Sequence, residues 1–317
     1  MSAVLDSPLR AATRFPAFVR PELLRRSSSP KNILTIDVED WFHVTNFESQ
    51  LPFSRWNKLA SRIQYSMPRL LDLLAKYRAH ATFFTLGWVA RRFPSLVKRI
   101  VREGHEIASH GENHRLVRGQ RPREFRNQLV ASRDILEQIS GEAVKGHRAP
   151  SYSLDSSTLW SVGILFESGF EYDSSVFPFG FRRDPEWCDK RFPCRLGDDG
   201  LGSIAEYPLS TLRLAGRNLP VAGGGYFRFL PYSFTRWAVK QLNEEGHSAV
   251  MYLHPWELDP GQPRVRNAPW LSRFRHYHRL ESAEAKFSRL LADFRFHSIR
   301  DVYWSRWTER YEITPQI

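Results

Sequence analysis

The residues NILTIDVED, at positions 32–40, combine a run of apolar side chains with three carboxylates at its end. Short apolar runs with polar flanks are typical of strands buried inside a parallel sheet, so this stretch predicts a buried strand. Asp37, Glu39 and Asp40 would then lie at its carboxyl edge, where (β/α) barrels hold their functional side chains. We therefore expect an α/β fold with its chemistry at this edge.

The rest of the chain alternates strand candidates with helix candidates. Further strands are predicted near positions 83, 107, 146, 172, 206 and 251. Helices, several of them opened by proline or closed by glycine, are predicted at 66–74, 94–103, 122–140, 159–168, 232–245 and 281–294. About seven strand–helix units favour a barrel or a doubly wound sheet over a sandwich. Residues 178–204, rich in proline and glycine, predict an irregular insertion.

The composition is that of an ordinary globular protein, since 42% of the 317 residues are hydrophobic and 25% are charged. The longest nearly uncharged apolar stretch, 81–90, is about half as long as a membrane-spanning helix requires. Residues 1–30 lack the apolar core of a secretory signal, so we expect a cytoplasmic protein. The two cysteines, Cys188 and Cys194, are too few for a disulfide framework or a four-cysteine zinc site.

Lys and Arg outnumber Asp and Glu by 46 to 34, which gives a net charge of +12. The sign of this charge fits nucleic acid, anionic lipid or an acidic polymer. The basic residues are scattered and no nucleic-acid-binding signature accompanies them, so we expect no nucleic-acid partner. Residues 1–30, rich in Arg, Ser and Pro, predict a flexible arm.

Polar residues follow other predicted strands as well. The motif HGENH places His110 and His114 at positions i and i+4, a spacing that lets both imidazoles reach one metal ion. A carboxylate from the first strand would complete a three-ligand site. Arg148 follows the fourth predicted strand, Asp173 the fifth and His254 the last, so all three are expected at the same edge.

Each of these residues also has a plain structural interpretation. The histidine pair could lie on the surface, the carboxylates in a solvated loop, Arg148 in a structural salt bridge and His254 in the core. Three carboxylates within four residues repel one another unless a cation or an arginine compensates, which favours the metal site. The run Gly223–Gly225 before Tyr226 predicts either a tight turn or a wall of a sugar groove.

Four motifs resemble, in order, those of the polysaccharide deacetylase family, also called the NodB-homology family or carbohydrate esterase family 4. The resemblance covers about residues 30–260 and implies a distorted (β/α) barrel. The motifs are TIDVEDW at 35–41, SHGENH at 109–114, RAPS at 148–151 and YLH at 252–254.

Wider features narrow the resemblance to deacetylases encoded with exosortase and PEP-CTERM exopolysaccharide systems, which carry a C-terminal extension. These features are GGGYFR at 223–228, HPWE at 254–257 and HYHR at 276–279. The resemblance therefore implies a catalytic barrel at 31–260 after the arm at 1–30, and an extension at 261–317 that packs on the barrel.

The resemblance implies a role for each motif residue. Asp37 would be the general base, Arg148 would orient it, and His254 would be the general acid toward the departing amine. His110 and His114 would bind one divalent ion, which would be zinc or else cobalt, nickel or manganese.

The motifs depart from the family pattern at two positions. Val38 replaces a metal-binding Asp, so the carboxylate ligand is expected to be Glu39 or Asp40. We favour Glu39, which shares a strand face with Asp37 if the strand continues. Ser151 replaces the usual Tyr and removes a ring from the substrate cleft, although its backbone N–H would still stabilise the oxyanion.

Further residues are assigned to the substrate side of the site. Asp173 is expected to be the acidic partner of the catalytic histidine, with Glu206 as a competitor, and Tyr226 is expected to contact the sugar. Exposed tryptophans would stack on sugar rings, with Trp41, Trp187, Trp256 and Trp270 as candidates.

The sequence thus predicts a metal-dependent hydrolase that removes N-acetyl groups from amino sugars of an exopolysaccharide or its precursor. Two alternatives stay open: a cyclic imide or ureide hydrolase on the same fold, and a non-catalytic carbohydrate-binding or nucleic-acid-binding relative. A cytoplasmic enzyme would meet a nascent glycan at the inner face of the membrane. The basic arm would then contact anionic lipid there, near exopolysaccharide biosynthesis proteins.

Overall fold

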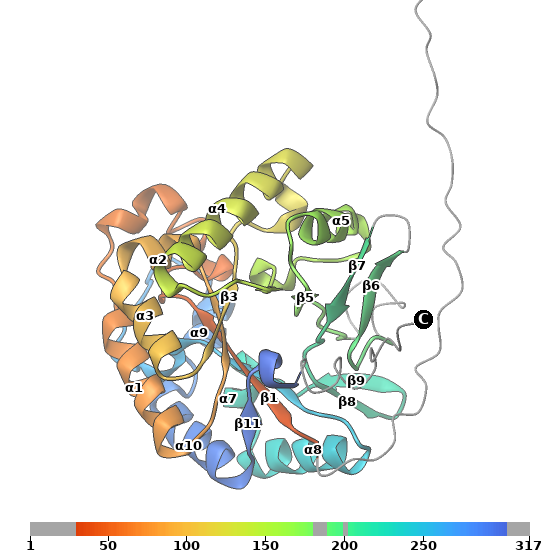
Figure 1. Cartoon of the computed structure of the whole chain (residues 1–317). Helices are drawn as coiled ribbons and strands as arrows, with labels where there is room; N and C mark the ends of the chain where they lie inside the picture. Colours follow the sequence, from red (N-terminus) through yellow and green to blue (C-terminus); the bar gives the residue numbers. More distant parts are fainter. Residues whose placement is uncertain (1–29, 180–188, 199–201, 303–317) are drawn as a thin grey trace, which may run out of the picture.

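The seven strands predicted from the sequence lie in one curled sheet of the computed structural model, which describes residues 30–179, 189–198 and 202–302 (Figure 1). Neighbours along the order β10-β1-β2-β3-β4-β5-β7 are all parallel. The expected α/β barrel is thereby confirmed as a half-barrel. The strands are β1 (Asn32–Val38), β2 (Thr82–Thr85), β3 (Glu106–Ser109), β4 (Gly146–His147), β5 (Tyr172–Asp173), β7 (Gly202–Glu206) and β10 (Val250–Leu253).

Four further strands were not expected from the sequence. β6 (Cys194–Asp198) pairs antiparallel with β7, and β11 (Phe296–His297) pairs parallel with β1. β8 (Thr211–Leu214) and β9 (Arg217–Pro220) form a separate hairpin. The described part of 178–204, expected to be irregular, therefore contributes a β-ribbon, in which Leu196 faces Ile204 across the ladder.

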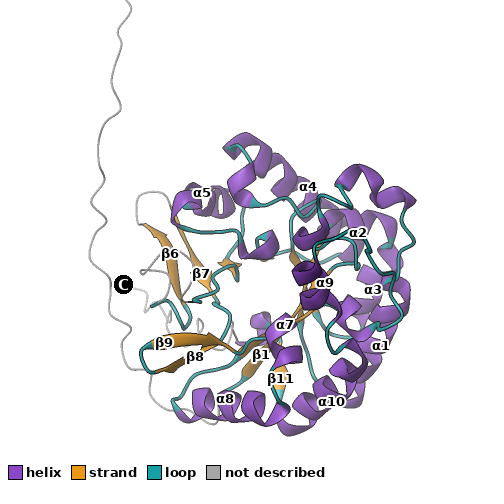
Figure 2. Ribbon diagram, turned by 180° about the vertical axis from the view of Figure 1, so that it is seen from behind, coloured by secondary structure: helices purple, strands orange, loops and turns teal. Residues whose placement is uncertain are grey.

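Helices cover the outer face of the curled sheet, as Figures 1 and 2 show from opposite sides. Several boundaries follow from local sequence: α4 begins with Pro122 in its first turn and ends before Gly141, whose φ is 74°. The helices are α1 (Ile63–Lys76), α2 (Gly87–Arg92), α3 (Pro94–Arg102), α4 (Pro122–Ser140), α5 (Trp160–Glu167), α7 (Gly224–Phe229), α8 (Tyr232–Glu244), α9 (Trp270–Tyr277) and α10 (Ala283–Asp293).

Burial of β1 on both faces decides where its carboxylate points. Its apolar residues at 34, 36 and 38 pack in the main core with residues of the outer helices. Ile33 packs in a smaller cluster with Phe84 and Tyr252. Because side chains alternate between the two faces of a strand, Asp37 shares the inner face with Ile33.

Residues 261–302 are built into the same structure. β11 extends the sheet beside β1, and a third apolar cluster joins residues 41–56, which follow β1, to Trp256 and residues 265–280. Trp41 and Trp256 are buried there, contrary to expectation, whereas Trp270 on α9 is 74% exposed.

Several expectations concern residues outside the described ranges. They are the arm up to residue 29, Trp187, Cys188 and the end of the chain from residue 303. Within the described ranges, the helices are all too short or too polar to cross a bilayer.

Candidate active site

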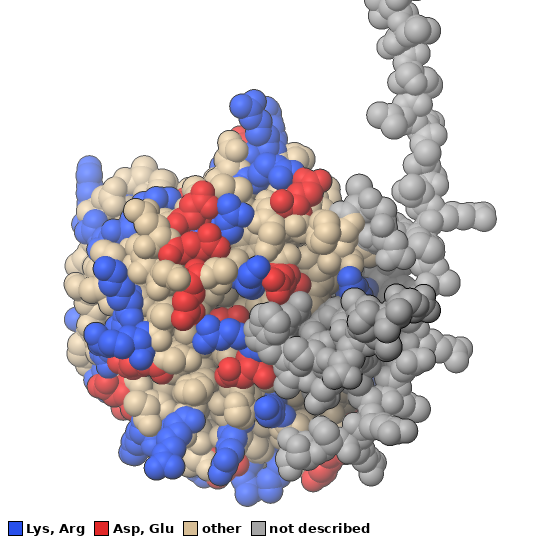
Figure 3. Space-filling view, in the orientation of Figure 1, with Lys and Arg blue, Asp and Glu red and all other residues tan. Residues whose placement is uncertain are grey.

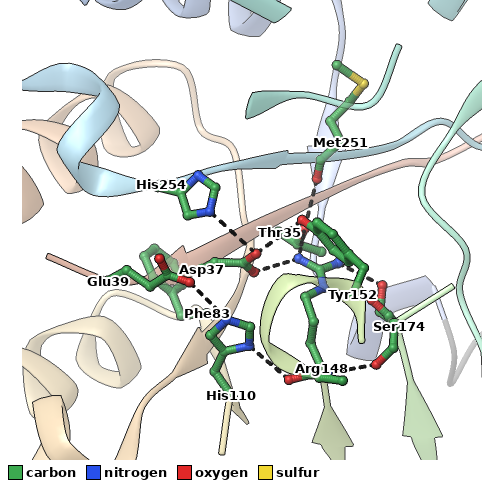
Figure 4. A network of polar contacts seen from close by, with 12 residues as sticks. Thr35, Asp37, Glu39, Phe83, His110, Arg148, Tyr152, Ser174, Met251 and His254 are labelled. Atoms are coloured by element: carbon green, nitrogen blue, oxygen red, sulfur yellow. Dashed lines mark hydrogen bonds and ion pairs between the residues drawn. The ribbon is translucent and has the colours of Figure 1, made fainter. Parts of the chain in front are cut away.

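The candidate active site lies where β1, β3, β4 and β10 end. Parallel strands deliver their carboxyl ends to one edge of a sheet, so the polar residues after them meet there. Figure 4 shows the convergence of Asp37, Glu39, His110, Arg148 and His254.

Glu39, His110 and His114 form a group whose ligand atoms all lie within 4.8 Å of one another. Oε1 of Glu39 lies 3.0 Å from Nε2 of His110 and 2.9 Å from Nε2 of His114. Burial opposes ionisation of Glu39, but His114 and His254 hold the pKa of its carboxyl well below the usual range. The group therefore presents a buried carboxylate to two imidazoles.

The hydrogen bonds of His110 leave one ring nitrogen to bind a cation. Nδ1 of His110 lies 2.8 Å from the carbonyl oxygen of Arg148, which can only accept, so Nδ1 carries the proton. Nε2 of the neutral ring then turns a lone pair toward Glu39, another acceptor, at 3.0 Å. Two acceptors at this distance repel unless a proton or cation lies between them, and two imidazoles with one carboxylate suit zinc-like ions.

Asp40, the alternative ligand, is engaged elsewhere. Its oxygens accept from the main-chain N–H of Arg62 at 2.9 and 3.1 Å and from the hydroxyl of Ser61. Asp40 thus caps the start of α1, where the helix dipole favours a carboxylate. Of the two candidates, the structure brings Glu39 to the histidines.

Asp37 is held by a fully buried arginine. Nη1 of Arg148 donates to Oδ1 of Asp37 at 2.7 Å and to Thr35 at 2.8 Å. Nε and Nη2 of Arg148 donate to the carbonyl and hydroxyl oxygens of Ser174, which fixes the guanidinium plane. Burial disfavours the charge, yet Asp37 and other neighbours raise the pKa of Arg148, so the pair is ionic.

Tyr152 supplies the ring that Ser151 lacks. Its hydroxyl donates to Oδ2 of Asp37 at 3.2 Å, and its ring packs edge-on against Phe177 and Tyr252. Ser151 and Tyr152 have φ values of 50° and 53°, so two successive residues in the left-handed region form a tight turn. The expected loss of a ring from the site is therefore wrong.

Glu257 is the acidic partner of His254. Oε1 of Glu257 accepts from Nδ1 of His254 at 2.9 Å, which leaves Nε2 facing Oδ2 of Asp37 at 3.9 Å. Burial lowers the pKa of His254, but Glu39 and Glu257 outweigh it and raise that pKa to about 9. The His254 side chain is 16% exposed, so a charged imidazole can reach a substrate.

Asp173 does not reach His254, which corrects the sequence prediction. The parallel register places Asp173 opposite His147, and its Oδ1 lies 2.7 Å from Nδ1 of that histidine. Its competitor Glu206 accepts from the N–H of Val176 instead. Burial and the adjacent Asp173 raise the pKa of Glu206 well above its usual range. Both carboxyls are fully buried and belong to the core beneath the site.

Ser151 precedes Tyr152 in the chain, and Tyr226 is linked to Tyr152 through the ring of Phe177. The hydroxyl of Ser151 is hydrogen-bonded to Thr45 at 2.6 Å, and the role of its backbone N–H stays a prediction. Tyr226, in α7, is 37% exposed and contacts Phe177, which contacts Tyr152. A line of aromatic rings therefore leads from the surface to Asp37.

Family models match segments of this chain that carry His110, His114, Arg148 and His254, whereas Asp37 and Glu39 lie outside the matched segments. A family model described as polysaccharide deacetylase matches residues 61–164, and a domain of unknown function, DUF3473, matches residues 174–304. A peptidoglycan-N-acetylglucosamine deacetylase of Bacillus cereus is 41% identical over 83 residues, which are 26% of this chain and 30% of that protein. A chitooligosaccharide deacetylase of Sinorhizobium fredii is 32% identical over 101 residues, which are 32% of this chain and 45% of that protein.

These matches support a relationship between this chain and the polysaccharide deacetylase family. The chain spans less than half the length of either relative. Deacetylases of carbohydrate esterase family 4 are metalloenzymes, and the Glu39–His110–His114 group could hold a metal ion.

Solved structures share the fold of this chain. A protein described as a polysaccharide deacetylase from Mycobacterium smegmatis has a TM-score of 0.56 at 20% identity, over 90% of this chain and 93% of that one. Puue allantoinase has a TM-score of 0.57 at 16% identity, over 93% of this chain and 99% of that one. At such identities the likeness concerns the fold alone.

Sequence reasoning missed three residues of the site. Tyr152 directly follows the third motif, and Glu257 stands three residues after His254, a spacing typical of capping boxes. Both residues could have been found from their positions next to the motifs. Arg228 touches Glu257 across 29 positions, and only the folded chain reveals that contact.

Proposed function

We propose that this protein is a metal-dependent hydrolase that removes N-acetyl groups from amino sugars of an exopolysaccharide or its precursor. The observation that carries the proposal is the meeting of three units at one sheet edge. These units are the Glu39–His110–His114 group, the Asp37–Arg148 pair and the His254–Glu257 pair. Together they offer ligands, a held carboxylate base and a charged imidazole acid.

The chain's own groups divide the proton transfers between them. Asp37, held by Arg148 and Tyr152, accepts a proton from the attacking water. His254 donates the proton on Nε2 to the departing amine, while Glu257 retains Nδ1. The backbone N–H of Ser151 stabilises the oxyanion. A zinc or similar ion held by Glu39, His110 and His114 would polarise the acetamide carbonyl and acidify water.

The proposal includes the place in the cell where the reaction occurs. A cytoplasmic enzyme acting on a nascent glycan at the inner membrane face would work beside exopolysaccharide biosynthesis proteins. The net charge of +12, from 46 basic and 34 acidic residues, supports contact with an anionic surface. Figure 3 shows blue basic residues scattered among acidic ones on one face.

Acetate release from N-acetylglucosamine oligomers by the zinc-reconstituted protein tests this function. Wild type is compared with Asp37→Asn, which removes the base, and with His110→Ala, which removes a ligand. We expect acetate from wild type and a loss of at least about 100-fold in each variant. Hydrolysis of a cyclic ureide without acetate release would favour the imide hydrolase. Saturable oligosaccharide binding without hydrolysis of either compound would favour a binding protein.

A further inference from the structure

A buried arginine joins the proposed general acid to the C-terminal part of the chain. Arg228 in α7 is 2% exposed, and its Nε donates to Oε2 of Glu257 at 2.7 Å. Its two Nη atoms donate to three main-chain carbonyls at 2.6 to 3.0 Å, those of Arg275, His276 and His278. The guanidinium is thus held on one side by a carboxylate and on the other by residues 275–278.

Both oxygens of Glu257 are committed as well. Oε1 accepts from Nδ1 and from the main-chain N–H of His254, at 2.9 and 3.0 Å. Oε2 accepts from Arg228. Since Glu257 is fully buried, its carboxylate cannot rotate without leaving a buried charge without a partner. The carboxylate therefore fixes which nitrogen of His254 faces the substrate.

A stack of rings forms a second link between the same parts. Trp256 lies between two imidazoles, with ring centroids 5.0 Å from His254 and 4.1 Å from His276. Nε2 of His276 pairs with the side-chain oxygen of Gln262 at 2.7 Å, which orients this outer ring. Residues 262–278 thus support His254 through a charged link and through ring packing.

We propose that Arg228 and Glu257 are positioning residues for His254, and that residues 262–278 serve as the scaffold that holds Arg228 in place. The inference rests on the proposed role of His254 as general acid. It gives the C-terminal segment a part in catalysis without any contact with substrate. The chemistry follows from geometry: with Nδ1 held, Nε2 stays aimed at the leaving group.

Leaving-group dependence separates positioning from mere stabilisation of the fold. An amine must be protonated as it departs, whereas 4-nitrophenolate departs without a proton. Loss of His254 alignment should therefore slow cleavage of N-acetylglucosamine oligomers far more than cleavage of 4-nitrophenyl acetate. A general loss of folded site would slow both reactions equally.

Glu257→Gln and Arg228→Met are the test variants, and Asp259→Asn is the matched control. Asp259 lies in the same segment and binds Arg62 in an ion pair at 2.7 Å. In both test variants we expect kcat for the oligomer to fall at least about 100-fold, with KM and ester turnover within about threefold of wild type. The control should leave the ratio of amide to ester turnover unchanged, and Arg228→Lys should restore part of it.

A second readout does not depend on turnover. In proton–nitrogen NMR spectra of the histidine side chains, the Nδ1 proton of His254 should resonate far downfield in wild type and move upfield in Glu257→Gln and Arg228→Met. Equal losses of amide and ester turnover, or an unmoved Nδ1 signal, would overturn the inference. If wild type releases no acetate while the signal shifts as expected, the proposed function fails and the positioning of His254 stands.

Discussion

The hydroxyl of Tyr152 donates to Oδ2 of Asp37 at 3.2 Å, while Arg148 donates to Oδ1 of the same carboxylate. Burial and the adjacent Asp37 raise the pKa of Tyr152 well above its usual value, so its hydroxyl remains a donor at neutral pH. Asp37 is therefore held by one charged and one neutral donor.

Replacing Tyr152 with Phe removes the neutral donor and keeps the ring. We expect kcat for acetate release to fall about tenfold, because one hydrogen bond to a charged group is lost. KM and the melting temperature should change little, since the ring contacts with Phe177 and Tyr252 remain. Steady-state kinetics beside thermal unfolding measures both, and an unchanged kcat would show that Arg148 alone fixes Asp37.

Neutral substitutions of the adjacent residues Glu39 and Asp40 should have different effects on zinc binding and on stability. Glu39→Gln should abolish zinc retention after dialysis, because a neutral amide is a poor zinc ligand. Asp40→Asn should retain zinc but lose about 1 kcal/mol of unfolding free energy, because one oxygen that accepts from the donors around the start of α1 becomes an amide NH2, which cannot accept. Metal analysis and urea unfolding distinguish the two. Zinc loss in Asp40→Asn with retention in Glu39→Gln would reverse the assignment.

Gly223, in the glycine run before Tyr226, cannot accept a side chain. Gly223 has a φ of 154°, and a Cβ there would lie 1.8 Å from the carbonyl oxygen of Tyr252 in β10. Gly223→Ala should therefore cost about 3 kcal/mol or more. Gly225→Ala meets open space in α7 and should be neutral or stabilise the protein by up to about 1 kcal/mol. Equal melting temperatures for the two variants would contradict this close packing.

Acid should destabilise the protein partly through His276. Burial and Arg228 lower its pKa to about 3 in the folded chain, against about 6.5 when unfolded. As the pH falls below 6.5, His276 takes up a proton in the unfolded chain but stays neutral in the folded protein. Its contribution to stability is therefore lost by up to about 1.4 kcal/mol per pH unit between these pKa values.

His276→Gln isolates this contribution, because glutamine does not titrate. The stability difference between wild type and variant should be constant from pH 8 to 9 and should shrink below pH 6.5. Urea unfolding across this range, with chelator present throughout, gives the curve. A difference that stays constant down to pH 5 would mean that His276 takes up a proton as readily in the folded protein as in the unfolded chain.

Local sequence determined the order of the elements and the residues that meet at the sheet edge. The apolar run 32–38 predicts β1 because burial on both faces requires it, and Pro122 and Gly141 set the bounds of α4. Parallel strands then deliver Asp37, His110 and His254 to one edge, whatever their distance along the chain. The strands β8 and β9 escaped prediction because they form a separate hairpin outside the alternation of strands and helices, and β11 escaped it because its two residues are not part of an apolar run.

Only the tertiary structure decided which carboxyl group serves which partner. Glu39 and Asp40 are neighbours in sequence, yet one meets two histidines and the other caps a helix. The register of β5 beside β4 assigns Asp173 to His147, so that Glu257 is left to hold His254. Such choices depend on side-chain directions at the ångström scale across strands far apart in sequence. Residue type and spacing along the chain do not encode those directions.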